Sequence, residues 1–326
     1  MTEQLYHNPR YNCIHVTLAA MLHKLGFDEE LLFHQSGLYF LNEPDGDLPY
    51  VLDPYYRKFS DLIQCCFGVK VRTEEYMSLA LCMDRIEQLI TDGYPVGILV
   101  DIYSLEYSNS FNSKHYLHSI EITDYVEGMY RIFDHYYQHQ EQVPPSKLAE
   151  WLMSCQENLS EQLLLLYHID SSSRIVGQKH DYRDSLISNY EIMKGDRIGA
   201  YVDPSLAPGL VGIAAIMPYG EMLIEDIYLP PVERNKRCSH GYSSLKEISN
   251  SRHHCYNYLQ KFGEHHLAGL YYAAHQSWMV LSNLLMRAAM YPNSQMEQRL
   301  QKRLSNIAEQ EIVILNGIER EIINKL

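Results

Sequence analysis

The chain has 326 residues, of which 46% are hydrophobic and 21% are charged, so we expect a soluble globular protein large enough for two domains. Its formal net charge of −14 argues against nucleic acid as a partner, because phosphate binding needs clustered lysine and arginine. Apolar runs are too short for a membrane span, the N-terminus lacks a signal-peptide pattern, and the seven irregularly spaced cysteines suit a reduced, cytoplasmic protein.

The N-terminal half mixes helical and strand patterns. Apolar residues at helical spacing predict a helix over residues 13–25 and another over 83–91. A turn is expected at 44–47, and the polar, tyrosine-rich residues 103–117 suit a surface loop. The expected strands are 38–41, 95–101, 119–125, 129–133 and 163–169.

The pattern changes near Ser171-Ser172-Ser173. Two apolar runs, 210–217 and 222–229, predict a small β-hairpin across Tyr219-Gly220, and the chain beyond Pro231 reads as helical. The expected helices there are 241–262, 266–290 and 295–325. We therefore predict an α+β fold with domains at 1–170 and 171–326, the second mainly helical, and its long amphipathic helices are compatible with a homodimer.

Three residues stand in an order that suits nucleophilic catalysis: Cys13 at a helix start, His118 on a strand, and Asp134 on the next strand. The nucleophilic form of a thiol is the thiolate, which is favoured by the N-terminal end of a helix and by a neighbouring imidazolium. A carboxylate then binds the far ring nitrogen of the histidine and fixes its tautomer. This order of residues is that of a papain-like site.

The hairpin between His118 and Asp134 sets a geometric condition. A two-residue turn at Glu127-Gly128 would place the two side chains on opposite faces of the hairpin. One bulge, or a three-residue turn, would place them on the same face. A catalytic triad therefore predicts an irregularity of one residue in this hairpin.

Each of the three residues has a structural reading as well: a small buried hydrophobe for Cys13, a structural histidine for His118 and a turn former for Asp134. The clusters His253-His254-Cys255 and Glu264-His265-His266 suggest metal binding at first sight. Neighbouring helix residues diverge by about 100°, so each cluster offers one or two ligands per face, and we expect no metal. Phosphate-loop and Gly-x-Ser-x-Gly patterns are missing from the sequence.

The N-terminal half resembles the butirosin biosynthesis protein H family, a papain-like cysteine fold related to C39-like peptidases. The resemblance covers about residues 5–155 and rests on ordered pieces rather than on one decisive motif. The pieces are Asn12-Cys13 with the following helix and Leu25-Gly26, Leu32-Phe33 leading to Gly37–Phe40, Pro95–Asp101 with Tyr103–Tyr107, and His115-x-x-His118 followed by Asp134.

The resemblance implies an acyltransferase of antibiotic-type, nonribosomal natural-product assembly, which moves an acyl or aminoacyl group from a carrier-protein thioester to an amine. Cys13 would hold the acyl group, His118 would act as the base, and Asp134 would orient His118. The acyl group would arrive on the phosphopantetheine arm of the carrier protein, so no cofactor bound by this chain is expected. Residues expected to bind the oxyanion or the substrate are Asn12, Asp101, Tyr107 and His115, and His115 is also the rival base.

One difference from the related peptidases bears on the choice between acyl transfer and hydrolysis. Those peptidases place a glutamine several residues before the cysteine, whereas this chain has His7-Asn8-Pro9-Arg10 there. This favours acyl transfer over peptidase activity. The alternatives are a cysteine hydrolase (peptidase, amidase or thioesterase) and a non-catalytic scaffold or binding protein. A site that excludes water, lined by loop 103–117 and the run Tyr136-Tyr137, would favour transfer over hydrolysis.

Overall fold

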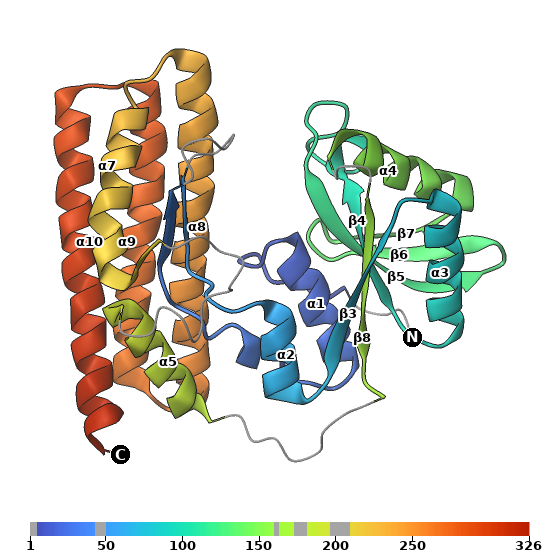
Figure 1. The fold of residues 1–326 in the computed structure, drawn as a ribbon, viewed down its shortest axis with the longest axis horizontal. Helices are drawn as coiled ribbons and strands as arrows, with labels where there is room; N and C mark the ends of the chain where they lie inside the picture. The colour runs from blue at the N-terminus through green and yellow to red at the C-terminus, as the bar shows by residue number, and fades with distance from the viewer. Residues whose placement is uncertain (1–4, 43–49, 160–162, 173–180, 196–208, 326) are drawn as a thin grey trace. The chain divides into compact units, whose positions relative to one another are not determined.

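A computed structural model describes residues 5–42, 50–159, 163–172, 181–195 and 209–325 (Figure 1). The chain forms two compact units. Unit 1 contains residues 1–29 and 63–178, and unit 2 contains residues 30–62 and 179–326. The chain passes from unit 1 to unit 2 near residue 178, and residues 30–62, which precede most of unit 1, also belong to unit 2.

Unit 1 is built on a six-stranded antiparallel sheet in the order β3-β8-β4-β5-β6-β7. Its strands are β3 Lys70–Tyr76, β4 Val96–Asp101, β5 Leu117–Val126, β6 Met129–Asp134, β7 His139–Val143 and β8 Leu164–Asp170. Its helices are α1 Cys13–Lys24, α3 Leu79–Thr91 and α4 Pro145–Asn158, with the short 3-10 helix η2 at Ile102–Ser104.

The core of unit 1 lies between the sheet and helices α3 and α4. Alternate residues of β4, β5 and β6 contribute buried isoleucines, among them Ile98, Ile120 and Ile132. These pack with Ile86 of α3 and Trp151 of α4. The period of two in the strands is what lets one face of the sheet be apolar.

Helix α1 is joined to strand β5 by polar contacts. Thr17 Oγ1 lies 3.4 Å from the carbonyl oxygen of Ser119. Lys24 donates to the fully buried carboxylate of Glu121 at 3.1 and 3.2 Å, and His135 Nε2 lies 2.7 Å from the same carboxylate. The helix that begins at Cys13 is thus tied to the two strands that carry His118 and Asp134.

The β5–β6 hairpin contains the predicted irregularity of one residue. Glu127 and Gly128 form a two-residue turn with φ values of 55° and 77°. Beyond the turn the register shifts between Ile122 and Asp124. Continued past Phe133, the shifted register sets Asp134 beside Ile120 instead of Glu121, on the same face of the hairpin as His118. The expectation drawn from the sequence is confirmed.

Unit 2 combines a three-stranded sheet with long helices. Its strands, in the order β2-β1-β9, are β1 Tyr39–Asn42, β2 Tyr50–Asp53 and β9 Leu210–Val211. Its helices are α5 Tyr182–Lys194, α7 Ile216–Asp226, α8 Pro231–Lys261, α9 His265–Met290 and α10 Ser294–Glu321. Short 3-10 helices occur at η1 Glu29–Leu32, η3 Gly212–Ala215 and η4 Ile323–Lys325, and α2 spans Phe59–Phe67.

Residues 30–62 are held in unit 2 by buried hydrogen bonds. Arg252 of α8 donates to the carbonyl oxygen of Gly37 at 3.0 Å, and Asn189 of α5 donates to that of His34 at 2.8 Å. The guanidinium of Arg252, 0% exposed, also pairs with Glu311 of α10 at 2.9 Å. A buried charge is tolerated when it is paired in this way.

The predicted hairpin at 210–217 and 222–229 is wrong. Only Leu210–Val211 form a strand, which pairs with β1, and residues 216–226 are helical. The buried residues Ile216, Tyr219 and Leu223 recur at helical spacing. Gly220 lets α7 approach α10 closely, because a Cβ there would lie 2.4 Å from Leu304 Cδ1. The apolar run fits either a strand or a helix, and packing against α10 selects the helix.

The α+β class with a helical C-terminal region is confirmed. Helix α8 begins at Pro231 rather than near residue 241, while α9 and α10 follow the predicted ranges closely. The turn expected at 44–47 lies outside the described residues. Among the helices in the described ranges, none is both long and apolar enough to cross a membrane.

The sheet packs so closely at Gly97 of β4 that the position has no room for a side chain. A Cβ at this position would lie 2.2 Å from Cζ of Tyr167, a buried ring whose hydroxyl hydrogen-bonds Ser119 at 2.5 Å. We expect Gly97→Ala to lower the free energy of unfolding by about 1–3 kcal/mol, the usual cost of overpacking. Denaturant unfolding measures this.

The matched control is Gly269→Ala on the exposed side of α9, where an added Cβ meets no atom within 4 Å. It is expected to raise the free energy of unfolding by about 0.5–1 kcal/mol, because alanine is the better helix former. Equal effects of the two substitutions would contradict the packing described for Gly97.

Candidate functional site

Cys13 is the first residue of α1, and its position is fixed by a helix cap. The side-chain oxygen of Asn12 accepts a hydrogen bond from the N–H of His15 at 2.9 Å. Thr17 Oγ1 donates to the carbonyl oxygen of Cys13 at 2.8 Å. Cys13 is half-buried, so its thiol is reachable from solvent. The first N–H groups of a helix have no intrahelical partner and favour a negatively charged group at this end.

His118 and Asp134 form a buried pair. Nε2 of His118 lies 2.7 Å from Oδ2 of Asp134, and the two side chains are 3% and 0% exposed. The other carboxylate oxygen accepts the backbone N–H groups of Tyr136 and Tyr137, each at 3.0 Å. Both oxygens of this buried carboxylate are therefore hydrogen-bonded and held in place.

The surroundings of His118 favour its protonated form. Burial on its own lowers the pKa of the imidazole, but the hydrogen bond with Asp134 and the interaction with the Cys13 thiol outweigh it and raise the pKa of His118 from 6.5 to about 9. Since Nε2 is bound to Asp134, Nδ1 is the nitrogen left for Cys13. The structure thus brings together the three residues predicted for catalysis.

Aromatic rings surround this pair. The rings of Tyr136 and Tyr137 lie 5.8 and 5.3 Å from the His118 ring, measured between centroids. Tyr107, one of the predicted substrate-binding residues, lies behind Asp134, where burial and the negative charge of Asp134 raise the pKa of its phenol. Its ring stacks on His139 at 3.9 Å. Tyr107 is therefore within the electrostatic influence of Asp134, and its predicted substrate-binding role stays a prediction.

Asp101 and His115 lie apart from the triad and bind each other. Nδ1 of His115 is 2.6 Å from Oδ2 of Asp101, and Ser154 of α4 donates to the same oxygen at 2.8 Å. The His115 ring stacks on Tyr103 at 4.2 Å. Because His115 has its own carboxylate, Asp134 is left to His118, and the predicted substrate-binding role of Asp101 and His115 stays a prediction.

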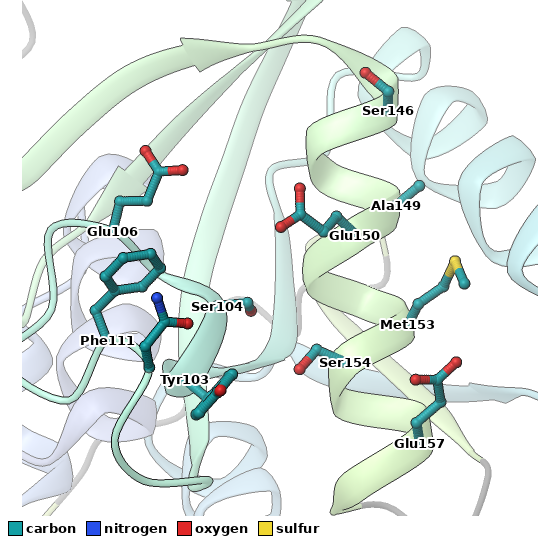
Figure 2. Close-up of a pocket in the computed structure, with 11 residues that line it drawn as sticks. Tyr103, Ser104, Glu106, Phe111, Ser146, Ala149, Glu150, Met153, Ser154 and Glu157 are labelled. Atoms are coloured by element: carbon teal, nitrogen blue, oxygen red, sulfur yellow. The ribbon is translucent and has the colours of Figure 1, made fainter.

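A cavity of about 610 Å³ adjoins this second pair, between residues 103–112 and α4 (Figure 2). Glu150 and Ser154 point from α4 toward the loop, and Glu106 and Phe111 come from the opposite wall. None of the three triad residues lines it. The sequence pointed to loop 103–117 but gave no sign of α4, because Ser154 joins Asp101 only through tertiary packing.

Three of the other thiols are poor candidates for a nucleophile. Cys82, Cys238 and Cys255 are fully buried, and burial raises the pKa of their thiols to about 12, 11 and 11. Within the described residues, no three histidine, cysteine, aspartate or glutamate side chains are grouped so that they could hold a metal ion. This applies to the two histidine clusters as well.

The fold and the site define an α+β protein with a cysteine at a helix start beside a carboxylate-bound histidine. Residues 12–135 match the family described as butirosin biosynthesis protein H, N-terminal, so this stretch of the chain is similar to that family. The predicted resemblance is confirmed, and the match indicates a transferase-type role in biosynthesis. No curated protein matches the chain.

The raised pKa of His118 gives a test of its pairing with Asp134. We expect Asp134→Asn to lower the pKa of His118, because burial is then opposed by a weaker partner. NMR titration of the imidazole measures this. Asp124→Asn on the same hairpin, whose carboxylate only accepts the neighbouring Tyr125 N–H, is the control and should leave the pKa of His118 unchanged.

Stability should follow the same titration. A histidine whose folded pKa is raised stabilises the fold below its unfolded pKa of about 6.5 and loses this contribution as the pH rises through about 9. The difference in free energy of unfolding between wild type and Asp134→Asn should therefore shrink from pH 6 to pH 10, by on the order of 2–3 kcal/mol. A difference that grows over this range would contradict the assignment.

Proposed function

We propose that this chain is a cysteine-dependent acyltransferase of natural-product biosynthesis. It moves an acyl or aminoacyl group from the thioester of a carrier protein, through Cys13, to an amine acceptor. The observation that carries the proposal is the position of His118, which is bound by Asp134 and interacts with the Cys13 thiol. The match of residues 12–135 to a biosynthetic family supports transfer as the reaction class.

The first half-reaction forms the acyl-enzyme. Cys13 reacts as the thiolate, its proton already held by His118; the sulfur attacks the thioester carbonyl, and the C–S bond to the carrier arm breaks. The departing thiolate takes the proton from His118, which leaves the imidazole neutral and able to act as a base. The oxyanion develops beside Cys13, so the donors nearest to it along the chain are the first backbone N–H groups of α1. The Asn12 oxygen is used by the helix cap, and its predicted help to the oxyanion stays a prediction.

The second half-reaction releases the product. The acceptor amine attacks the acyl carbon, the bond to the Cys13 sulfur breaks, and His118 takes a proton from the amine, which restores the Cys13 thiolate beside the protonated His118. Asp134 holds the imidazole in one orientation throughout and stabilises its charged form. The phosphopantetheine arm belongs to the carrier substrate and is not a cofactor of this chain.

Hydrolysis is the second candidate, and the partial exposure of Cys13 is the observation that favours it. A peptidase, amidase or thioesterase would use the same acyl-enzyme and pass it to water. A non-catalytic scaffold would form no acyl-enzyme at all. The three readings therefore separate on one experiment.

The experiment is intact-mass analysis after incubation with an acyl N-acetylcysteamine thioester. We expect one acyl adduct on the wild type and none at this position in Cys13→Ala. His118→Ala should slow acylation by about 10²–10⁴-fold, the usual contribution of a general base.

Cys65→Ala is the matched control, because Cys65 is the exposed cysteine of unit 1 and lies on a different helix. It should acylate like the wild type. An adduct that persists in Cys13→Ala and disappears in Cys65→Ala would move the nucleophile elsewhere, and a wild type without adduct would sink the proposal. Transfer is distinguished from hydrolysis by whether added amine or water receives the group.

A further inference from the structure

Two consecutive tyrosines cover the ring of His118. The centroids of Tyr136 and Tyr137 lie 5.8 and 5.3 Å from that of His118, with interplanar angles of 74° and 45°. The two tyrosine rings also contact each other edge to face at 5.2 Å. His118 is 2% exposed beneath them, so the base is shielded from bulk water.

The two tyrosines occupy different depths. Tyr136 is the outer ring, 42% exposed. Tyr137 is the inner ring, where burial, followed by the nearby charges of Tyr136, Asp134 and Cys13, raises the pKa of its phenol to about 12. Because its ring lies 5.3 Å from that of His118, Tyr137 stands next to the base that would serve an acyl group on Cys13.

The backbone of both tyrosines is anchored to the carboxylate that orients the base. The backbone N–H groups of Tyr136 and Tyr137 each donate to Oδ1 of Asp134 at 3.0 Å, while Oδ2 binds His118. One carboxylate therefore fixes the imidazole and the backbone of its cover together.

On the basis of the proposed function, we propose that Tyr136 and Tyr137 determine how the acyl group on Cys13 is divided between an organic amine and water. In transfer, a C–N bond forms, the C–S bond breaks, and His118 takes the proton of the amine. In hydrolysis, a C–O bond forms instead and His118 takes a proton of water. The same base serves both, so access to it decides the outcome.

The rings discriminate between the two acceptors for a physical reason. An organic ammonium or amine gains contact with an aromatic face, by cation–π attraction and by burial of its apolar part. Water gains neither and is displaced from the space beside His118. The exposed side of Tyr136 is the entry surface for the amine, and Tyr137 fills space beside the His118 ring.

The test is the product ratio from the acyl-enzyme. Wild type is acylated with the N-acetylcysteamine thioester, freed of excess thioester, and exposed to cyclohexylamine. Amide and free acid are quantified by mass spectrometry. We expect Tyr136→Ala and Tyr137→Ala to lower the amide-to-acid ratio by about 5-fold or more, which corresponds to the loss of one aromatic contact. Tyr137→Phe should recover the ratio relative to Tyr137→Ala, because the ring is kept.

Tyr125→Ala is the matched control. Tyr125 is an exposed tyrosine of β5, and its ring packs on Tyr130 at 4.5 Å, far along the hairpin from His118. It should leave the product ratio unchanged. The pH profile of acylation is recorded for each variant, since a general loss of structure would change acylation and not only the division of products.

Two negative outcomes are distinguishable. A wild type that forms no acyl-Cys13 overturns the proposed function and this inference with it. A protein that acylates normally and gives the same amide-to-acid ratio in Tyr136→Ala, Tyr137→Ala and wild type overturns the inference alone.

Discussion

The hydrogen bond between His118 and Asp134 depends on one extra residue in strand β5. Without the register shift between Ile122 and Asp124, the two side chains would point to opposite faces of the hairpin. With it, Asp134 accepts three hydrogen bonds in a fully buried position, one from His118 and two from the backbone beyond the strand. The protonation of His118 and the placement of the tyrosines both follow from this carboxylate.

Much of the site could be predicted from the sequence because its geometry follows from simple counting. A helix that begins near Cys13 and a two-residue turn at Glu127-Gly128 are local signals, carried by the Asn12 cap and by a glycine with positive φ. Since side chains alternate along a strand, the spacing from His118 to Asp134 requires either one bulge or a three-residue turn if both side chains are to share a face. The position of the bulge, however, is a tertiary detail that the spacing does not contain.

The parts that the sequence could not predict depend on contacts between distant segments. Residues 210–229 are apolar enough for a strand or a helix, and the helix is selected because Gly220 fits against Leu304 of α10. Ser154 joins Asp101 and His115 only because α4 packs beside the end of β4. Residues 30–62 follow α1 directly, yet they pack in unit 2 through Arg252 and Asn189. No local sequence pattern predicts such a contact with a distant segment.

The path of the chain through the two units has a consequence for how the protein can be divided. Residues 30–62 leave unit 1 after α1, and unit 1 resumes only at residue 63, so neither unit is a continuous stretch of the gene. A fragment that stopped near residue 170 would carry β1 and β2 without β9 and without the helices that satisfy Gly37 and His34. The family match from residue 12 to 135 runs through this excursion. The two units therefore cannot be separated by a single cut in the chain.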